Sequence, residues 1–535
     1  MAGPAIDRSS LHAIEGTWLE VRLTPSSEYG LRAFAALRAF APGEEARAAA
    51  CAQRIARVAA SLEPSRLDAA RDVLRRAPDA AGALARAAMG EALADVQFLE
   101  LQRCFDAMIA LDALLECAVD AEPCSNEAVR QCVAALEPGR SGAFGFYLSD
   151  AFDPRLGEGR KALTGSQAQV DAARGRAAAT ICARLGREEI SGNEFIVMRA
   201  DVPASGLPAG MRVIREAATY LVCELDADEA TLGAIERRDG ALASVAEAEE
   251  CVRERLSTVL RERAAALDAA MQALGTLDVL VAQARFVQSY RCVVPEYVAR
   301  AAMAFSGGRH LPTVEALERD GRAFTPLDLE LDGVAVLTGP NMGGKSVALR
   351  TCGFIALCAA YGLPVPATHA RVGLFDDIAW LGIGGDDERG SLLSSFATEV
   401  VRLRDLFARG AQRRLLLVDE FARTTTPHEG KALLIAVIER LRERGVCGIV
   451  ATHLGGIAGA TGATHLAVRG LRGIPHRPAT ADLHAALAAL ADSMDYTIAQ
   501  VNGPGEERSD AIALAALLGL DEALIAAASA AFSQP

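Results

Sequence analysis

The sequence predicts a chain of several domains, in which long helices precede a domain built on a parallel β-sheet. With 535 residues the chain is too long for a single hydrophobic core. Its hydrophobic content is 51%, yet only 5% of the residues are aromatic, and this Ala- and Leu-rich composition favours long helices. From about residue 324 to 469, strand-like apolar runs alternate with helical patterns, which is typical of a parallel sheet covered by helices.

The part before residue 316 is predicted to be mostly helical, with one small β insert. Apolar residues at close to helical spacing form a stripe in its first half, made of Phe98, Leu101, Phe105, Met108 and Leu115. Residues 195–198 and 220–223 have the pattern of short strands, with proline and glycine turn signals between them. A helical pattern returns from about residue 229 to 284. Two helical arms would thus flank the β insert, like a lever with a tip.

A glycine-rich loop follows the apolar run 334–338. Its spacing, Gly-x4-Gly-Lys-Ser, is that of a phosphate-binding loop, in which backbone N–H groups point inward and the lysine reaches the β- and γ-phosphates. The hydroxyl of the last residue ligates Mg²⁺, and the next helix adds the positive end of its dipole. The pattern predicts a nucleotide site, with a ligand-free glycine turn as the alternative. The loop residues are Gly339, Pro340, Asn341, Met342, Gly343, Gly344, Lys345 and Ser346.

The composition indicates that the loop needs its lysine. Only three lysines occur in the chain, Lys161, Lys345 and Lys431, against fifty-two arginines. The planar guanidinium of arginine cannot take the place of a compact ammonium in such a loop.

Polar residues follow two later apolar runs. The run 415–418 ends in Asp419 and Glu420, the arrangement in which one carboxylate holds Mg²⁺ and the next orients or deprotonates the attacking water. His453 follows the run 448–450, where it would contact the γ-phosphate or that water. Ser394 and Ser395 open an amphipathic helix and would form an anion site. A solvated acidic pair, a structural histidine and an ordinary helix cap are the alternatives.

Composition also limits the class of protein. The net charge of −14 makes duplex DNA a less expected partner, because proteins that grip DNA usually carry a basic face. Twelve cysteines without a Cys-x-x-Cys pair indicate reduced thiols and a cytoplasmic location. The N-terminus has no signal-peptide pattern, and charges interrupt the longest apolar runs, so we expect no membrane association.

Five ordered motifs resemble the ATPase domain of the MutS proteins, a branch of the ABC ATPases. Residues 338–346 read T-G-P-N-M-G-G-K-S, as in that family, and V-P-A follows at 365–367. Residues 394–399 are similar to its S-T-F-M-x-E signature, 419–426 to its D-E-hydrophobic-G-R-G-T-S run, and 452–453 to its T-H. Looser likenesses are L-D-V-L at 277–280 and the helical dimerisation segment at 510–515.

This resemblance implies a Mg²⁺-dependent ATPase that works as a dimer, most simply a homodimer. The phosphate loop with Lys345 would bind ATP, and Ser346 with Asp419 would hold Mg²⁺. Glu420 would position water and His453 would sense the γ-phosphate. Ser394 or Ser395 would complete the site of the partner subunit.

The resemblance also implies a division into five segments. A helical core with the first lever arm (1–185) is followed by a β insert at the lever tip (186–228) and the returning lever helices (229–315). An α/β P-loop ATPase domain of ABC type (316–480) and a helical C-terminal dimerisation segment (481–535) complete the chain.

The chain departs from the family pattern in three places. Leu392 and Leu393 stand where the signature usually has Gly and Arg, and Ala422 and Thr424 replace two glycines. We expect the chain to begin in the helical core, without the two domains that precede it in mismatch-repair proteins. The Phe-x-Glu wedge of those proteins has a nearby match only at residues 98–100, where we expect Phe98 to be core packing.

Three functions stay open at this point. The first is an ATP-driven machine that remodels a protein partner, because the chain resembles the reactivase ATPase associated with a cobalamin-dependent aminomutase, lysine 5,6-aminomutase. The second is a mismatch-repair-like or branched-DNA ATPase that binds duplex DNA at the lever tip. The third is a nucleotide-bound scaffold without hydrolysis, which the presence of Glu420 and His453 disfavours.

Overall fold

The computed structural model describes residues 6–532 apart from fourteen stretches: 117, 119–121, 143–144, 191, 193, 205, 341–342, 383–394, 411–412, 424, 472–492, 502–511, 513–514 and 517–519. Contacts between Cα atoms divide the chain into two compact units. The first comprises residues 1–76, 111–122 and 273–535, and the second comprises residues 77–110 and 123–272.

The first unit contains a six-stranded sheet in the order β11-β12-β13-β9-β14-β15. All neighbouring pairs are parallel except β14 and β15, so the parallel-rich α/β sheet expected from the sequence is present. The register places Gly382, Asp419 and Ala451 side by side at the ends of three strands. The bounds are β9 Val334–Thr338, β11 Asp377–Gly382, β12 Arg414–Asp419, β13 Cys447–Ala451, β14 Thr464–Leu471 and β15 Met494–Gln500.

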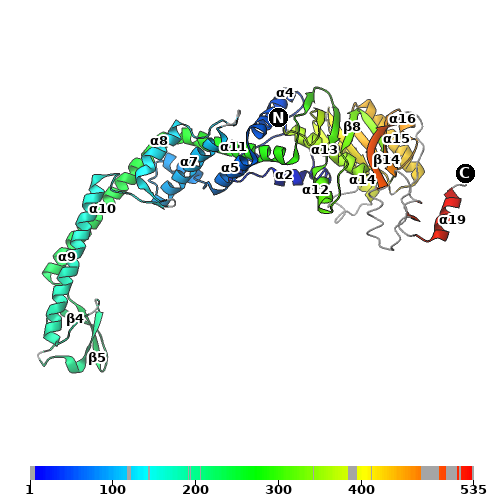
Figure 1. Ribbon diagram of the computed structural model, residues 1–535. Coiled ribbons are helices and arrows are strands. Elements are labelled where there is room, and N and C mark those ends of the chain that lie inside the picture. Colours follow the sequence, from blue (N-terminus) through cyan, green and yellow to red (C-terminus); the bar gives the residue numbers. More distant parts are fainter. Residues whose placement is uncertain are drawn as a thin grey trace. The chain divides into compact units, whose positions relative to one another are not determined.

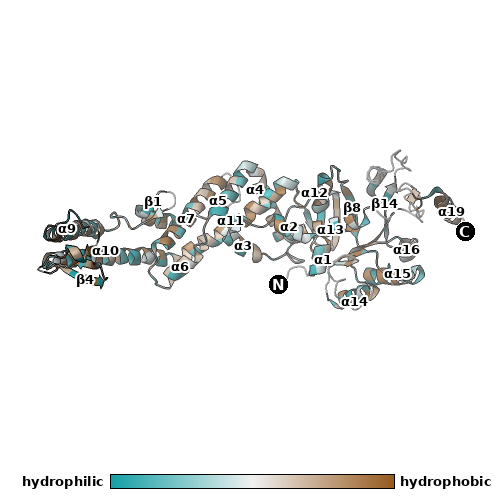
Figure 2. Ribbon diagram, turned by 90° about the horizontal axis from the view of Figure 1, so that it is seen from below, coloured by the Kyte–Doolittle hydropathy of each residue, from teal (hydrophilic) through white to brown (hydrophobic). Residues whose placement is uncertain are grey.

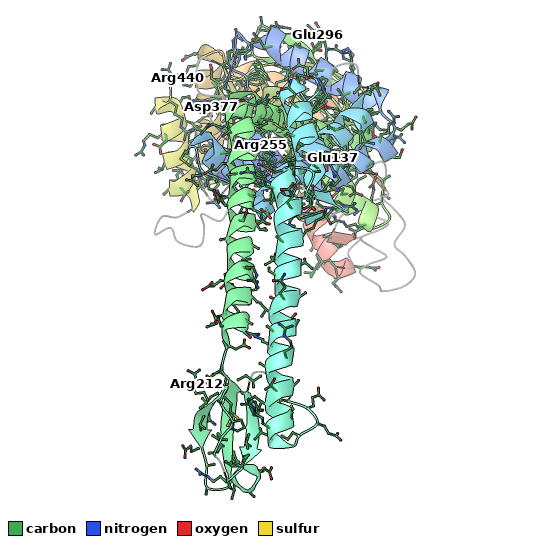
Figure 3. All side chains as sticks on the ribbon, turned by 90° about the vertical axis from the view of Figure 1, so that its left-hand side faces the viewer. Glu137, Arg212, Arg255, Glu296, Asp377 and Arg440 are labelled. Carbon is green, nitrogen blue, oxygen red and sulfur yellow. The ribbon has the colours of Figure 1, made fainter. Side chains whose placement is uncertain are left out.

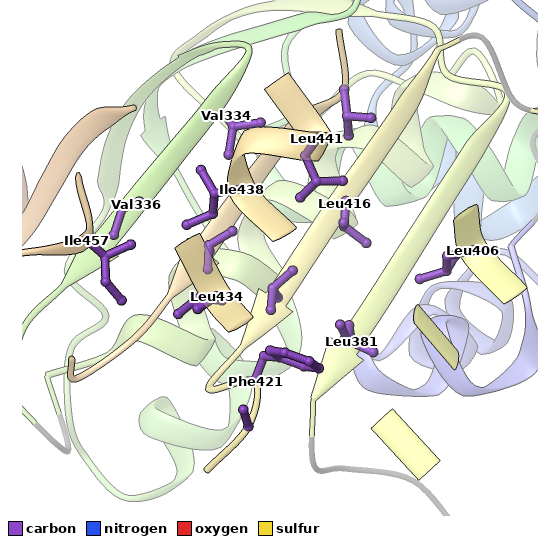
Figure 4. Packing of buried hydrophobic residues seen from close by; sticks show 14 of the residues in the cluster. Val334, Val336, Leu381, Leu406, Leu416, Phe421, Leu434, Ile438, Leu441 and Ile457 are labelled. Carbon is purple, nitrogen blue, oxygen red and sulfur yellow. The ribbon is translucent and has the colours of Figure 1, made fainter. Parts of the chain in front are cut away.

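Among the described elements, the helices that alternate with these strands along the chain are α13 (Lys345–Ala360), α14 (Ser395–Ala408), α15 (Pro427–Glu443) and α16 (Ile457–Thr461). Figure 4 shows Leu434, Ile438 and Leu441 of α15 packed over Val334 and Leu416 of the strands. Helix α13 is apolar on nearly all sides, which is typical of a helix enclosed by other elements. All its residues from Thr351 to Ala360 are buried.

A second sheet and the N-terminal helices complete the first unit. The order β6-β10-β7-β8 joins β6 (Glu296–Val298), β10 (His369–Gly373), β7 (Ala302–Gly308) and β8 (Leu327–Asp332), and α12 (Leu311–Arg319) follows β7. The first helices are α1 (Arg8–Ala13), α2 (Gly16–Arg22), α3 (Glu28–Ala35), α4 (Glu45–Ser61) and α5 (Pro64–Arg76).

The N-terminal helices lie in the same compact unit as the six-stranded sheet. The Trp380 N–H in β11 donates to the Ser10 hydroxyl at 2.9 Å, and the Phe40 N–H donates to the Ala360 carbonyl at 2.7 Å. These bonds join residues more than 300 positions apart, so a reading along the chain could not anticipate them.

The second unit is mainly helical. Its helices are α6 (Ala81–Ala88), α8 (Glu127–Leu136), α9 (Pro154–Leu185) and α10 (Glu229–Glu262), and α7 (Asp95–Leu115) and α11 (Ala264–Tyr290) each have residues in both units. Two-residue strands β1 (Arg140–Ser141) and β2 (Gly145–Phe146) pair beside them. Figures 1 and 3 show α9 and α10 side by side, with a small sheet at one end of the pair.

That small sheet has the order β3-β5-β4, with β3 Glu194–Met198, β4 Met211–Glu216 and β5 Tyr220–Leu225. Strands β3 and β5 agree with the two predicted strands. Strand β4 was not predicted, because Pro208 and Gly210 just before it were read as turn signals only. Figure 2 shows many hydrophilic residues along α9, α10 and β4.

Other outcomes concern the apolar stripe, the thiols and the C-terminus. Phe98 is fully buried, and its ring centroid lies 5.5 Å from that of Phe146. The prediction that Phe98 packs in the core is therefore confirmed. None of the eleven described cysteines forms a disulfide bond. The prediction that the chain is helical from residue 481 onward is wrong for β15, which pairs with β14, although α19 (Glu522–Phe532) is helical.

One described helix, α11, meets the length and composition of a membrane span, a feature that the sequence analysis overlooked. Of its most apolar window, 56% is buried within the protein. Buried core helices of globular proteins pass the same test.

Candidate nucleotide site at the carboxyl ends of the strands

The phosphate loop joins β9 to α13 through a backbone that only glycine adopts easily. Gly344 is the N-cap of α13 and has φ +86°, in the left-handed region. A Cβ atom there would lie 3.2 Å from Tyr496 of β15. The Gly343 N–H donates to the Pro340 carbonyl at 3.0 Å and closes a turn within the loop. Asn341 and Met342 lie outside the described residues.

Lys345 is the first residue of α13, and its side chain is only 5% exposed. The ammonium donates to the carbonyls of Gly339 at 2.9 Å and Pro340 at 3.2 Å, so it closes over the loop. Its Nζ lies 3.7 Å from Oε1 of Glu420. Burial lowers the pKa of Lys345, while the charges of Glu420 and Asp419 act in the opposite direction. A buried cation facing two carboxylates provides charges of both signs for a metal–phosphate ligand.

Asp419 ends β12 and contacts the residue predicted to share its metal. Burial raises the pKa of Asp419, and the neighbouring Ser346 hydroxyl partly offsets this effect. A hydroxyl and a carboxylate are both ligands that Mg²⁺ prefers, so the residues present fit that ion. The expected pair is thus brought together by β12 and the start of α13.

Glu420 begins a tight turn after β12. Its N–H donates to the Ala451 carbonyl at 3.0 Å, which ties the turn to the end of β13. Glu420 and Ala422 have φ +54° and φ +61°, both in the left-handed region. Oε2 of Glu420 lies 3.7 Å from the exposed guanidinium of Arg423, so this carboxylate has cations on two sides.

His453 lies in the turn after β13 and is exposed. Among the described residues, no hydrogen bond or ion pair joins its side chain to the four residues gathered by the loop and β12. Ser395 is the first residue of α14, but its side chain is outside the described part of the chain, as is the whole of Ser394. The proposed roles of these three residues therefore stay predictions.

The structure adds two neighbours of the loop that sequence reasoning missed. Oγ1 of Thr338 lies 2.8 Å from Nε2 of His465 in β14, and Tyr496 of β15 lies against Gly344. Tyr496 was missed because its segment was assigned to a helix. The alternation of Tyr496 and Ile498 with smaller residues is the signal that would have predicted a strand.

Comparison with known proteins supports the family resemblance. Residues 335–534 match the family model described as MutS domain V. A DNA mismatch repair protein MutS of Rhodopseudomonas palustris (strain BisA53) is 30% identical over 437 residues, which cover 76% of this chain and 48% of that protein. An endonuclease MutS2 of Pelotomaculum thermopropionicum is 32% identical over 204 residues, which cover 37% of this chain and 25% of that protein.

A third relative, the DNA mismatch repair protein MutS of Methanosarcina acetivorans, is 34% identical over 205 residues, covering 37% of this chain and 22% of that protein. The chain spans at most about half the length of these curated relatives. Residues 335–534 are thus similar to MutS domain V, and the similarity to MutS proteins extends over about three quarters of the chain.

Proposed function

We propose that the chain is a Mg²⁺-dependent ATPase of the MutS type. The observation that carries this proposal is the buried ammonium of Lys345, held by the loop carbonyls and 3.7 Å from Glu420. A nucleotide phosphate would replace those carbonyls as the partner of the ammonium. The Ser346 hydroxyl lies near enough to the Asp419 carboxylate to lower its pKa, so the two would take up a metal between them.

In this proposal the roles of Lys345, Asp419 and Glu420 are suggested by their contacts, and those of His453, Ser394 and Ser395 by the family resemblance alone. Lys345 and the loop N–H groups would bind the β- and γ-phosphates, and Glu420 would orient the attacking water and accept its proton. Mg²⁺, held by Ser346 and Asp419, would neutralise the charge that develops on the phosphate oxygens. His453 would sense the γ-phosphate, and Ser394 or Ser395 would act across a dimer.

The test is phosphate release by the wild type and the Glu420→Gln variant, in Mg²⁺ and in excess chelator. We expect Mg²⁺-dependent release that Glu420→Gln lowers by roughly a hundredfold or more, with ATP binding retained. Glu439→Gln, on the exposed side of α15, is the matched control and should hydrolyse normally. Normal turnover by Glu420→Gln would remove that residue from the mechanism.

For the partner, we propose a protein that α9, α10 and their sheet contact as ATP binding and release move them. The segment 186–228 has eight carboxylates against four arginines. Three of those arginines are within ion-pair distance of carboxylates of the same segment: Arg187 with Asp201, Arg199 with Glu216 and Arg212 with Glu224. An acidic tip repels phosphate backbones, which favours a protein over duplex DNA. The suggestion that this partner is a cobalamin-dependent aminomutase rests on the sequence resemblance alone.

DNA is the second candidate, favoured by the names of the relatives, which are mismatch repair proteins and an endonuclease. Fluorescence anisotropy of labelled homoduplex, mismatched and branched DNA at two salt concentrations separates the two candidates. Binding that ATP modulates and salt weakens steeply would favour DNA. An unchanged signal at roughly 100 μM protein, the weak end of non-specific affinity, would favour the protein partner. Under either candidate we place the protein in the cytoplasm.

A further inference from the structure

The turn that contains Glu420 has a left-handed backbone conformation, which is unfavourable for its residues. Glu420 and Ala422 both have positive φ, +54° and +61°, and neither is glycine. A left-handed L-residue costs about 1–2 kcal/mol, and such strain persists only where the surroundings enforce it. Something outside the turn must therefore hold it in place.

The contacts on the far side of the turn come from the first two turns of α14. Oε2 of Glu399 accepts the Ala422 N–H at 2.9 Å, and Glu399 is only 6% exposed. One turn earlier, the ring of Phe396 lies with its centroid 6.5 Å from that of Phe421, which is buried in the core below the turn. The turn is thus attached to α14 at two successive residues.

Burying the Glu399 carboxylate to make this attachment costs free energy. Burial raises the pKa of Glu399, and the Ala422 N–H and the charge of Arg402 counteract that effect. Burying a carboxylate costs free energy unless hydrogen bonds and charges compensate it. A carboxylate that accepts a backbone N–H forms a shorter and stronger bond than a neutral acceptor does, so it fixes the turn more rigidly.

The other end of the turn is fixed independently. The Glu420 N–H donates to the Ala451 carbonyl at 3.0 Å, so one bond ties the turn to β13 and the other ties it to α14. Glu420 lies between these two attachments, and its Oε1 is 3.7 Å from Nζ of Lys345.

We propose that Glu399 is a positioning residue, which holds the Ala422 N–H and thereby fixes the Glu420 carboxylate beside Lys345. The inference rests on the proposed function of Glu420. The proposal also gives α14 a role in the control of hydrolysis. Movement at the start of this helix, where Ser395 lies, would be transmitted through Glu399 to Glu420, which would orient the attacking water. Arrival of a partner subunit at that helix start would then control hydrolysis rather than ATP binding.

The test compares Glu399→Ala, Glu399→Gln, Ala422→Gly and the double variant Glu399→Ala/Ala422→Gly, with Glu439→Ala as an exposed control. For each we would measure kcat and KM for ATP, the Kd of a fluorescent ATP analogue, the melting temperature, and deuterium exchange of the amides at 420–422.

We expect Glu399→Ala to lower kcat ten- to a hundredfold, because small misplacements of a catalytic group have effects of this size. The Kd of the nucleotide should stay within about twofold, since Lys345 and the loop are untouched. Glu399→Gln, whose amide oxygen still accepts the N–H, should recover most of kcat. The double variant should regain melting temperature, because glycine relieves the left-handed strain, but should not regain kcat.

Three results would overturn the proposal: normal kcat in Glu399→Ala, recovery of kcat together with stability in the double variant, or unchanged exchange of the 420–422 amides. Deuterium exchange needs no hydrolysis, so it separates this inference from the proposed function. If the wild type releases no phosphate but Glu399→Ala speeds exchange at 420–422, the ATPase assignment fails and the positioning role stands.

Discussion

The burial of Lys345 predicts how substitutions at this position change the affinity for nucleotide. Lys345 is 5% exposed and bonded to two loop carbonyls, a space that fits an ammonium and not a planar guanidinium. We expect both Lys345→Ala and Lys345→Arg to raise the Kd of a fluorescent ATP analogue at least about tenfold, the loss of one charge-assisted bond. Titrations by fluorescence would measure this.

Lys161→Ala is the control for that titration, because Lys161 is exposed on α9 and far along the chain from the loop. It should bind nucleotide as the wild type does. Equal affinities of Lys345→Ala and Lys161→Ala would remove the loop from nucleotide binding.

Ala422 stands where the family resemblance has glycine, and its φ of +61° is the reason that glycine suits the position. Replacement by glycine relieves about 1–2 kcal/mol of strain and costs about 0.4–1 kcal/mol through the more flexible unfolded chain. We therefore expect Ala422→Gly to raise the free energy of unfolding by up to about 1.6 kcal/mol, measured by chemical denaturation. Ala50→Gly, on the exposed side of α4, should lower it by about 1 kcal/mol.

At the scale of elements, α11 is fixed to the N-terminal helices by one buried carboxylate. Asp278 is 1% exposed and accepts the Ser27 N–H at 2.7 Å, the Ser27 hydroxyl at 2.6 Å and the Ser26 N–H at 3.0 Å. Asp278→Ala leaves three donors without their acceptor, so we expect a loss of about 2–4 kcal/mol in the free energy of unfolding.

Asp268→Ala tests the same helix at an exposed carboxylate that only bonds Gln272 one turn away. Its loss should stay below about 0.5 kcal/mol. If the two variants unfold at the same denaturant concentration, the buried Asp278 network does not stabilise the helix.

The start of α12 makes the first unit sensitive to acid. Burial lowers the pKa of His310 to about 4, and its ring nitrogens contact the Thr313 hydroxyl at 2.7 Å and the Ile14 carbonyl at 3.3 Å. The unfolded chain takes up this proton near pH 6.5 and the folded chain does not, so stability falls as the pH drops from about 6.5 toward 4. The slope is about 1.4 kcal/mol per pH unit, and the total is on the order of 3 kcal/mol.

His310→Gln should flatten this part of the pH profile of unfolding, while His369→Gln, at an exposed position of β10, should leave it unchanged. Denaturation at pH 7.5, 6 and 5 measures the slope. An unchanged slope in His310→Gln would assign the acid sensitivity to other groups.

At the scale of the whole molecule, the proposed dimer predicts a nucleotide-dependent change in mass. Each ATP bound between the subunits would contact both of them, and these contacts would have to outweigh the repulsion of chains that each carry a net charge of −14. We expect Glu420→Gln with ATP and Mg²⁺ to sediment as a dimer at protein concentrations where the nucleotide-free form is monomeric. Added chelator should reverse the shift, and a mass that does not respond to nucleotide would contradict the dimer.

The sequence predicted some elements and site residues correctly and missed others. The phosphate loop and the Asp419–Glu420 pair were found because spacing along a few residues specifies their chemistry, and the structure brings them together. β15 was missed because its strand state depends on pairing with β14, and the bond from Trp380 of β11 to Ser10 was not anticipated because it joins residues 370 positions apart. Patterns within a short segment do not indicate which distant segment it pairs with or bonds to.

The sequence alone therefore determined the α/β class of the later part, the family resemblance and the residues that would meet ATP. Each of these follows from residue types within one short segment. Only the tertiary structure decided that Glu420 lies in a strained turn and that Glu399, which sequence reasoning had used only as part of a motif, holds it. The physical reason is that a left-handed φ and a buried hydrogen bond between α14 and the end of β12 arise from packing, since contacts between distant segments fix them.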